Sequence, residues 1–280
     1  MRTVSHTAQW TAAARALETE KPNPLIRDPL ARYLAEPDGF QLLNKFGGGG
    51  LQEFVAIRTH FIDEVIDKVV NQGELRQIVF IAAGMDTRAY RLPWHEDARV
   101  FEVDYEDLHD FKQTKLDQLI TQAQVDRRTV NADLAQDWIP ALVEQGFDKN
   151  KPTLWVAEAL FFFLTEAQAS HLLNTLYKAS APGSLLTLDL VNEELITNPG
   201  TQLFLSSLRS LGVPWLFGTN EPESFLSEHG WQVQVLSEPG EEGAGLAYWP
   251  YPVFPREIQS MPRNWLIQAV VKDGVERIEE

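Results

Sequence analysis

Apolar runs alternate with amphipathic segments through the middle of the chain. Five of these runs have the length and apolar character of buried strands, and they cover residues 77–84, 98–104, 128–134, 153–160 and 184–191. Segments with helical spacing lie between most of them, for example TEAQASHLLNTLYKAS, which begins at Thr165. Apolar strands that alternate with helices are typical of a parallel sheet covered on both faces. The pattern therefore predicts an α/β fold with a mainly parallel sheet.

The two ends of the chain have a different pattern. Residues 5–20 show helical spacing, and a second helix restarts around Asp28 and Pro29, an N-cap and first-turn pair. Near the other end, ESFLSEHGWQVQVL predicts a helix, a turn and a strand, and WLIQAVVK (265–272) predicts a last strand after a segment rich in proline and aromatic residues. These two late strands predict an antiparallel pair at one edge of the sheet.

The stretch FGGGG at 46–50 predicts a hinge before the next helical run. We therefore expect an N-terminal helical cap over residues 1–50 and a main domain over 51–280. The main domain is expected to carry lid or insert segments at about 192–222 and 240–262.

Composition narrows the classes of function. The 280 residues include 40 acidic and 24 basic side chains, for a net charge of −16, which argues against a surface that follows nucleic-acid phosphates. The chain has no cysteine, so a disulfide framework, a thiolate nucleophile and cysteine-ligated zinc are excluded, and no other metal motif is present. The N-terminus, MRTVSHTAQW, lacks the apolar core of a signal peptide. We expect a soluble cytoplasmic protein whose partner is a small molecule, with no membrane partner. The oligomeric state is not indicated.

Polar residues follow four of the predicted strands. They are Gly84, Asp104, Asp133 and Glu158. Ligands of open α/β sheets bind outside the carboxyl ends of the strands, so these residues predict one binding site at one edge. Glu158 lies in an apolar segment and therefore needs a ligand or an arginine partner.

The turn after the first strand identifies the kind of ligand. Gly84 and Asp104 have the spacing with which a glycine turn and a carboxylate hold one nucleoside. A pyrophosphate would need further glycines, and the negative charge of Asp86 would repel it, unless Asp86 serves only as the N-cap of a helix at TRAYRL. A nucleoside without phosphates avoids the conflict, and the positive sulfonium of S-adenosylmethionine suits an acidic site.

The motifs IAAGMDTRAYRL, FEVD, NADL and PTLWVAEALFFFL resemble, in order and spacing, those of the leucine carboxyl methyltransferase family. The N-terminal stretch SHTAQWTAAARALETEKPNPLIRDPLARYL is most similar to its bacterial branch, which includes polyketide O-methyltransferases. The resemblance covers roughly residues 5–195. It implies a class I methyltransferase fold, which is Rossmann-like, with an N-terminal helical cap over the site.

The resemblance also implies roles for residues at the nucleoside end of the cofactor, S-adenosylmethionine. Gly84 matches the cofactor turn, and Asp104 matches the residue that holds the ribose. Asp133 and Leu134 match residues that border the adenine, with Asp133 on the exocyclic amine.

Three further residues match positions at the methionine end of the cofactor. Arg58 resembles the arginine that meets the carboxylate, and Glu158 resembles the acid near the amino group. Arg15, from the cap, is a candidate for a second basic contact.

The sequence departs from the family pattern at three positions. Ala82 replaces the first glycine of the turn, and we expect it to keep a negative φ and to tighten the fit to the cofactor. Ala135 replaces an arginine associated with the acceptor carboxylate, and Phe163 replaces a common tyrosine. Both changes argue against methylation of a protein C-terminal leucine.

Together these features predict an S-adenosylmethionine-dependent O-methyltransferase that acts on a carboxylate or hydroxyl of a small metabolite, polyketide-like or peptide-derived, in bacterial secondary metabolism. The residues expected in the acceptor pocket are Phe162, Phe163, Trp215 and Phe217. No residue is assigned a catalytic role. Two alternatives stay open, namely a nicotinamide-dependent oxidoreductase and a protein that binds S-adenosylmethionine without catalysis.

Overall fold

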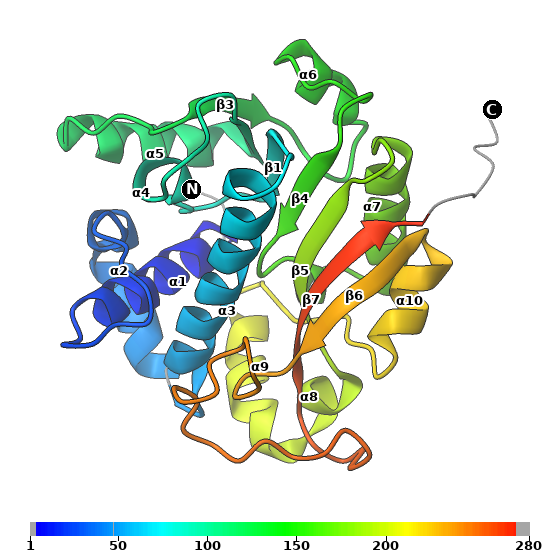
Figure 1. The fold of residues 1–280 in the computed structure, drawn as a ribbon. Helices are drawn as coiled ribbons and strands as arrows, with labels where there is room; N and C mark the ends of the chain where they lie inside the picture. Colours follow the sequence, from blue (N-terminus) through cyan, green and yellow to red (C-terminus); the bar gives the residue numbers. More distant parts are fainter. Residues whose placement is uncertain (1–3, 47, 273–280) are drawn as a thin grey trace.

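The computed structural model describes residues 4–46 and 48–272. Within these residues, seven strands form one sheet in the order β3-β2-β1-β4-β5-β7-β6 (Figure 1). The strands are β1 (Gln77–Ile81), β2 (Arg99–Asp104), β3 (Asp126–Asn131), β4 (Thr153–Ala157), β5 (Leu185–Val191), β6 (Trp231–Ser237) and β7 (Asn264–Val271). Strands β1 to β5 pair in parallel, whereas β7 is antiparallel to both β5 and β6. The predicted parallel sheet and its antiparallel edge are confirmed.

Helices and short helical turns connect and cover the strands. The longer helices are α1 (Val4–Thr19), α2 (Ala31–Phe46), α3 (Leu51–Ile66), α5 (Glu106–Gln118), α7 (Glu166–Lys178) and α9 (Gln202–Ser210). The shorter helical elements are α4 (Arg88–Arg91), α6 (Ile139–Glu144), α8 (Glu193–Thr197), α10 (Pro222–Glu228), η1 (Asp67–Asn71), η2 (Phe161–Phe163) and η3 (Pro199–Thr201). None of the helices in the described part of the chain is both long enough and apolar enough to cross a bilayer.

Alternate residues of each central strand enter different cores, one on each face of the sheet. On one face, Val79 and Ile81 of β1 pack with residues of α7 and α6. On the other face, Ile78 and Phe80 pack with residues of α3. This two-sided burial explains why the strands read as continuous apolar runs in the sequence.

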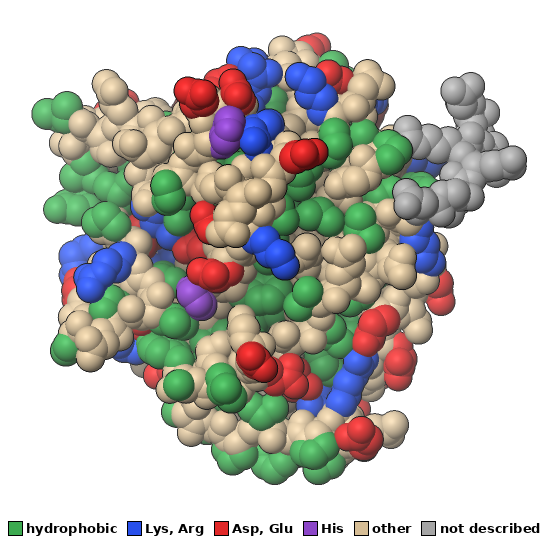
Figure 2. Space-filling view, in the orientation of Figure 1, with side chains coloured by type: hydrophobic (Ala, Val, Ile, Leu, Met, Phe, Trp, Pro, Cys, Tyr) green, Lys and Arg blue, Asp and Glu red, His purple; other side chains and the backbone are tan. Residues whose placement is uncertain are grey.

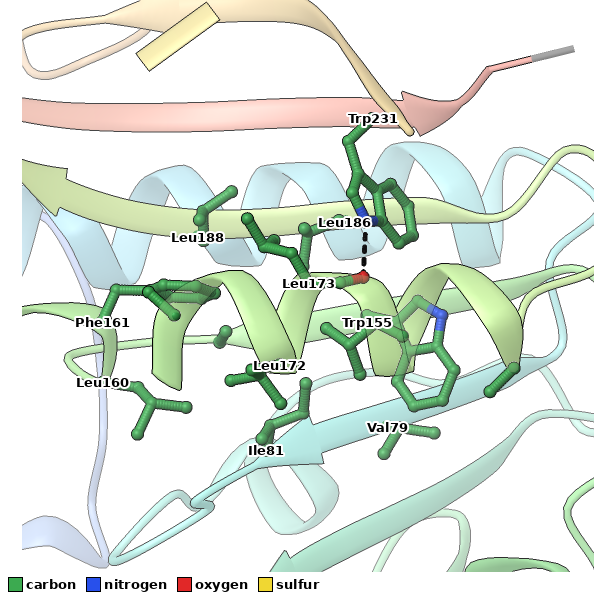
Figure 3. Close-up of a cluster of buried hydrophobic side chains, with 14 of the residues drawn as sticks. Val79, Ile81, Trp155, Leu160, Phe161, Leu172, Leu173, Leu186, Leu188 and Trp231 are labelled. Atoms are coloured by element: carbon green, nitrogen blue, oxygen red, sulfur yellow. Dashed lines mark hydrogen bonds between the residues drawn. The ribbon is translucent and has the colours of Figure 1, made fainter. Parts of the chain in front are cut away.

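The core beneath α7 includes two fully buried tryptophans, Trp155 and Trp231 (Figure 3). The indole N–H of Trp231 donates to the backbone carbonyl of Leu173 on α7 at 3.2 Å, so this polar atom is not left unpaired in the core. Thr165 and Gln168 form a capping box that fixes the start of α7 at the predicted position.

The first two helices pack against the main body rather than within the sheet. Residues of α1 and α2 share a third apolar cluster with residues of α3 and α5. The Asp28 carboxylate accepts hydrogen bonds from the backbone amides of Leu30 and Ala31, so it caps α2 as predicted. Gly47 of the predicted hinge lies outside the described residues.

Residues 238–263 connect β6 to β7 without a regular helix or strand, and they run along the lower edge of the molecule in Figure 1. Tyr248 donates a hydrogen bond to Glu18 of α1, so the connection is tied to the N-terminal helices. In Figure 2, Lys and Arg side chains on the visible face lie in small groups among acidic side chains.

Candidate functional site

A cavity with a volume of about 560 Å³ lies at the carboxyl ends of β1, β2 and β4. Residues from α1 and α3 form another part of its wall. The structure brings together ten of the residues predicted from the sequence along this cavity: Arg15, Arg58, Gly84, Asp104, Asp133, Leu134, Glu158, Phe162, Phe163 and Trp215. Its position is the one at which open α/β sheets bind ligands.

The glycine turn and Asp104 are in direct contact. The backbone N–H of Gly84 donates to one carboxylate oxygen of Asp104 at 2.7 Å, and the N–H of Tyr105 donates to the other at 2.8 Å. Burial raises the pKa of Asp104, and the two backbone hydrogen bonds oppose this rise. Each carboxylate oxygen keeps a second lone pair, so Asp104 can still accept hydrogen bonds from two ribose hydroxyls.

Two features of the turn, its backbone conformation and its distance from α1, favour glycine at position 84. The φ of Gly84 is +50°, in the left-handed region that favours glycine. A Cβ atom at this position would also lie only 3.2 Å from Cβ of Ala8, on the helix that covers the turn. The turn therefore places its backbone close to α1 and to any ligand between them.

The expectation for Ala82 is wrong. Its φ is +52° rather than negative, so the residue that replaces the family's first glycine lies in the left-handed region. This conformation costs a residue with a Cβ roughly 1 to 2 kcal/mol. The cost arises because, in this conformation, the Cβ atom lies too close to the following carbonyl oxygen.

Replacing Ala82 with glycine is expected to raise the free energy of unfolding by about 0.5 to 1 kcal/mol, because the relieved strain exceeds the added entropy of the unfolded chain. Urea unfolding would measure the change. The neighbouring variant Ala83→Gly is the control, since Ala83 is not among the residues with positive φ, and it is expected to lose stability. A loss of stability in both variants would contradict the assignment of strain to Ala82.

Arg58 is a buried arginine that joins two carboxylates. Its Nε donates to Glu158 at 3.0 Å and one terminal nitrogen donates to Asp189 at 2.9 Å. Its other terminal nitrogen, Nη2, is buried and has no hydrogen-bond partner among the described residues. A buried guanidinium donor without a partner is costly, and the carboxylate of a methionine moiety would satisfy it. The residue therefore fits the role predicted for it.

Glu158 has the arginine partner that its apolar surroundings predicted, and in fact it has two. One oxygen accepts from Arg58, and the other accepts from Arg88 at 2.8 Å. Burial alone would raise the pKa of Glu158, but the charges of Arg88 and Arg58 outweigh it and lower the pKa to about 2. Glu158 is therefore a fixed anion at the edge of the cavity.

The sequence reasoning missed Arg88. Its side chain is buried and contacts Asp63, Asp86 and Glu158. The signal was present in GMDTRAYRL, where an arginine two residues after Asp86 lies too close to the buried turn to be solvated. The N-cap residue of α4 is Thr87 rather than the predicted Asp86, although Asp86 accepts the backbone N–H of Arg88, the first residue of the helix, at 2.7 Å. The charge of Asp86 is also paired with the side chain of Arg88.

Asp133 and Leu134 line the cavity beyond the end of β3. One oxygen of Asp133 accepts from the backbone N–H of Ala135 at 3.0 Å and from the hydroxyl of Tyr105 at 3.3 Å. These bonds fix the direction of the Asp133 carboxylate beside Tyr105, the residue that follows Asp104 in the chain.

Arg15 also lines the cavity, and two of its nitrogens are already bonded within the protein. Its Nε donates to Asp28 at 2.9 Å, and one terminal nitrogen donates to the carbonyl of Met85 at 2.5 Å. Arg15 therefore fixes α1 to the glycine turn, whatever contact it makes with a ligand.

Three of the four aromatic residues predicted for the acceptor pocket lie together. The ring of Phe162 lies 4.2 Å from that of Trp215 and 4.9 Å from that of Phe163, centroid to centroid. Phe217 is not among the cavity residues. It is buried in the core beneath α7, with its ring 4.8 Å from that of Phe225, so the structure does not support its assignment to the pocket.

Acid is expected to destabilise the protein partly through Glu158. Because the folded-state pKa of about 2 lies below the value of 4.5 for an ordinary glutamate, the stabilisation is complete above pH 4.5 and is lost as the pH falls towards 2. Glu102, which is paired with Lys112 and Arg127, also has a pKa of about 2. Its contribution to stability is therefore lost over the same pH range. Between pH 4.5 and 2, each of the two groups lowers the free energy of unfolding by up to about 1.4 kcal/mol per pH unit.

Urea unfolding at a series of pH values below 5 would measure this slope. The variants Glu158→Gln and Glu102→Gln are each expected to show a shallower slope than the unmodified chain. If Glu158→Gln kept the full slope, the ionised state assigned to Glu158 would be wrong.

The strand order and the position of the cavity define the class of protein, because a sheet of order 3-2-1-4-5-7-6 with strand 7 antiparallel is the class I methyltransferase fold. Solved structures share it. A protein of the DUF574 family from Streptomyces avermitilis superposes with a TM-score of 0.65 at 14% identity, covering 97% of this chain and 100% of that one. Magnesium protoporphyrin IX methyltransferase from Synechocystis, solved with bound S-adenosylhomocysteine, has a TM-score of 0.51 at 13% identity, covering 84% and 95%.

Sequence comparison gives the family. Residues 8–177 match the model of the leucine carboxyl methyltransferase family. A protein of Mycobacterium avium (strain 104), provisionally named an S-adenosyl-L-methionine-dependent methyltransferase, is 34% identical in an alignment of 268 positions that covers 84% of this chain and 85% of the relative. A provisionally named counterpart from Streptomyces coelicolor is 32% identical in an alignment of 250 positions that covers 83% of this chain and 82% of the relative. The chain belongs to the leucine carboxyl methyltransferase family, and it is an S-adenosylmethionine-dependent methyltransferase.

Proposed function

We propose that this protein transfers the methyl group of S-adenosylmethionine to an oxygen atom, a carboxylate or hydroxyl, of a small polyketide-like or peptide-derived metabolite. We place the reaction in the cytoplasm and in bacterial secondary metabolism. The observation that carries the proposal is the single cavity that joins the Gly84–Asp104 turn to the aromatic group of Phe162, Phe163 and Trp215. The family description, which names a carboxyl acceptor, supports oxygen as the methylated atom.

The residues at the nucleoside end are proposed to bind as follows. Gly84 lets the cofactor approach the backbone, and Asp104 accepts from the ribose hydroxyls. Asp133 accepts from the adenine amine, and Leu134 packs beside the base. Each of these residues lines the cavity.

At the methionine end, Arg58 is proposed to bind the carboxylate and Glu158 the amino group, with Arg15 as a second basic contact. When bound, S-adenosylmethionine supplies a methyl group that is already activated by its positive sulfonium. The buried charges near Arg58 suit a cation, because three arginines face four carboxylates and one negative charge is left over. These seven side chains are Arg58, Arg88, Arg91, Asp63, Asp86, Glu158 and Asp189.

The acceptor is proposed to lie against the aromatic residues. Phe162 is buried, and Phe163 and Trp215 are half-buried, so this part of the cavity favours an apolar acceptor and keeps water from the methyl group. The main contribution of the chain is then to hold the acceptor oxygen in line with the bond that breaks. A carboxylate acceptor is already ionised and needs no base.

An assay with methyl-labelled S-adenosylmethionine and a panel of hydroxylated aromatic and carboxylated compounds tests the proposal. A labelled product that organic solvent extracts is the expected result, and Asp104→Asn is the inactive control. Alkaline treatment then separates the two oxygen acceptors, because a methyl ester releases labelled methanol whereas a methyl ether does not. Label found only on nitrogen or carbon, or no transfer to any of the panel, would contradict the proposal.

A further inference from the structure

Arg88 does not line the cavity, yet it contacts two of the carboxylates that do. Its Nη1 donates to Asp86 and, at 2.8 Å, to Glu158, both of which are cavity residues. The side chain of Arg88 is only 2% exposed, so solvent does not compete for these hydrogen bonds. Any effect of Arg88 on a ligand must therefore act through these two carboxylates.

The remaining donors of Arg88 are fixed to α3. Its Nε donates to Asp63 at 2.6 Å, and Nη2 donates to the backbone carbonyl of Thr59 at 3.3 Å. Helix α3 also carries Arg58, which holds the other oxygen of Glu158. The orientation of Glu158 is thus set by two guanidinium groups that are anchored on different elements, α3 and α4.

We propose that Arg88 is a positioning residue for the methionine end of the cofactor site and that it acts by holding Glu158. This inference rests on the proposed contact between Glu158 and the amino group of the cofactor. Because each oxygen of the Glu158 carboxylate is held by a different planar guanidinium, of Arg58 and of Arg88, the lone pairs that remain keep one direction in the cavity. A lysine at position 88 has a single ammonium in place of the fork, and it cannot hold Asp63, Asp86 and Glu158 together.

Arg91 provides a matched control. It lies on the same short helix, its side chain is 6% exposed against 2% for Arg88, and it binds Asp63 through two nitrogens at 2.7 and 2.8 Å. It contacts no carboxylate that lines the cavity. The variants Arg88→Lys and Arg91→Lys therefore remove comparable buried ion pairs, but only the first one disturbs Glu158.

The experiment is a double-mutant cycle on cofactor affinity, measured by calorimetry with S-adenosylmethionine in the full-length protein. Arg88→Lys is expected to weaken binding about tenfold or more, because it loses the geometry of the guanidinium fork, while Arg91→Lys stays within about twofold. In a Glu158→Gln background, Arg88→Lys is expected to cause no further loss. Arg88→Gln, which keeps an N–H donor, serves if the lysine variant does not fold.

Two results would overturn the inference. One is unchanged affinity in Arg88→Lys beside weakened affinity in Glu158→Gln, which leaves the proposed function intact. The other is a loss in the double variant equal to the product of the two single losses, since Arg88 would then act independently of Glu158. An unaffected Glu158→Gln variant would contradict the proposed role of Glu158 and this inference together with it.

Discussion

Replacing Asp104 with asparagine is expected to weaken the binding of S-adenosylmethionine about 100-fold, because hydrogen bonds to a charged group contribute about 1.5 to 3 kcal/mol each. The carboxylate accepts the backbone N–H groups of Gly84 and Tyr105 at its two oxygens. An asparagine has one oxygen, so its amide nitrogen must face one of these two donors. The variant therefore loses acceptors for the ribose and disturbs the glycine turn.

Calorimetric titration of the variant and the unmodified chain would measure this loss. Asp107→Asn is the matched control, because Asp107 is exposed in the first turn of α5 and does not line the cavity. NAD, titrated under the same conditions, is expected to give no binding. Equal affinity of Asp104→Asn and the unmodified chain would show that the nucleoside does not lie at Asp104.

Replacing Arg58 with methionine is expected to lower the free energy of unfolding by about 3 to 5 kcal/mol, because removal of one partner leaves a buried charge uncompensated. Arg58 is the cation that contacts Asp189, whose side chain is 1% exposed. Burial raises the pKa of Asp189, and the charge of Arg58 opposes this rise. Without the arginine, Asp189 must either bind a proton or remain as an unpaired anion.

Urea unfolding at neutral pH would measure this destabilisation. The double variant Arg58→Met/Asp189→Asn is expected to recover part of the stability, since the asparagine removes the unpaired charge and keeps an acceptor for the backbone N–H of Ala159. The affinity for S-adenosylmethionine is expected to stay low in both variants. A double variant less stable than Arg58→Met would contradict the charge-based explanation.

Much of the fold follows from the sequence because burial on both faces leaves a strong pattern. The predicted strand at 77–84 contains β1, and the run at 153–160 contains β4, although both strands end earlier, at Ile81 and Ala157. The chain leaves the sheet at these points because Ala82 and Ala159 both have positive φ values. Alanine gives no local signal for that conformation, so periodicity alone cannot locate the ends of the strands.

The part of the candidate site that lies at the carboxyl ends of the parallel strands could be predicted from the sequence. Gly84, Asp104, Asp133 and Glu158 follow four parallel strands, and the topology alone brings them to one edge. The apolar surroundings of Glu158 predicted a partner for it, but they could not identify that partner as Arg88, which lies 70 positions away in the sequence. For the same reason Phe217 could be recognised as apolar from the sequence but not assigned to the core or to the cavity.

The most direct test of the proposed cofactor site is a crystal structure of the protein with S-adenosylhomocysteine, the demethylated product. The proposed site predicts ribose hydroxyls within hydrogen-bond distance of the Asp104 carboxylate and the homocysteine carboxylate on Arg58. It also predicts that the sulfur faces the aromatic group of Phe162, Phe163 and Trp215. A ligand bound elsewhere, or bound in this cavity with its ribose away from Asp104, would contradict the proposed site.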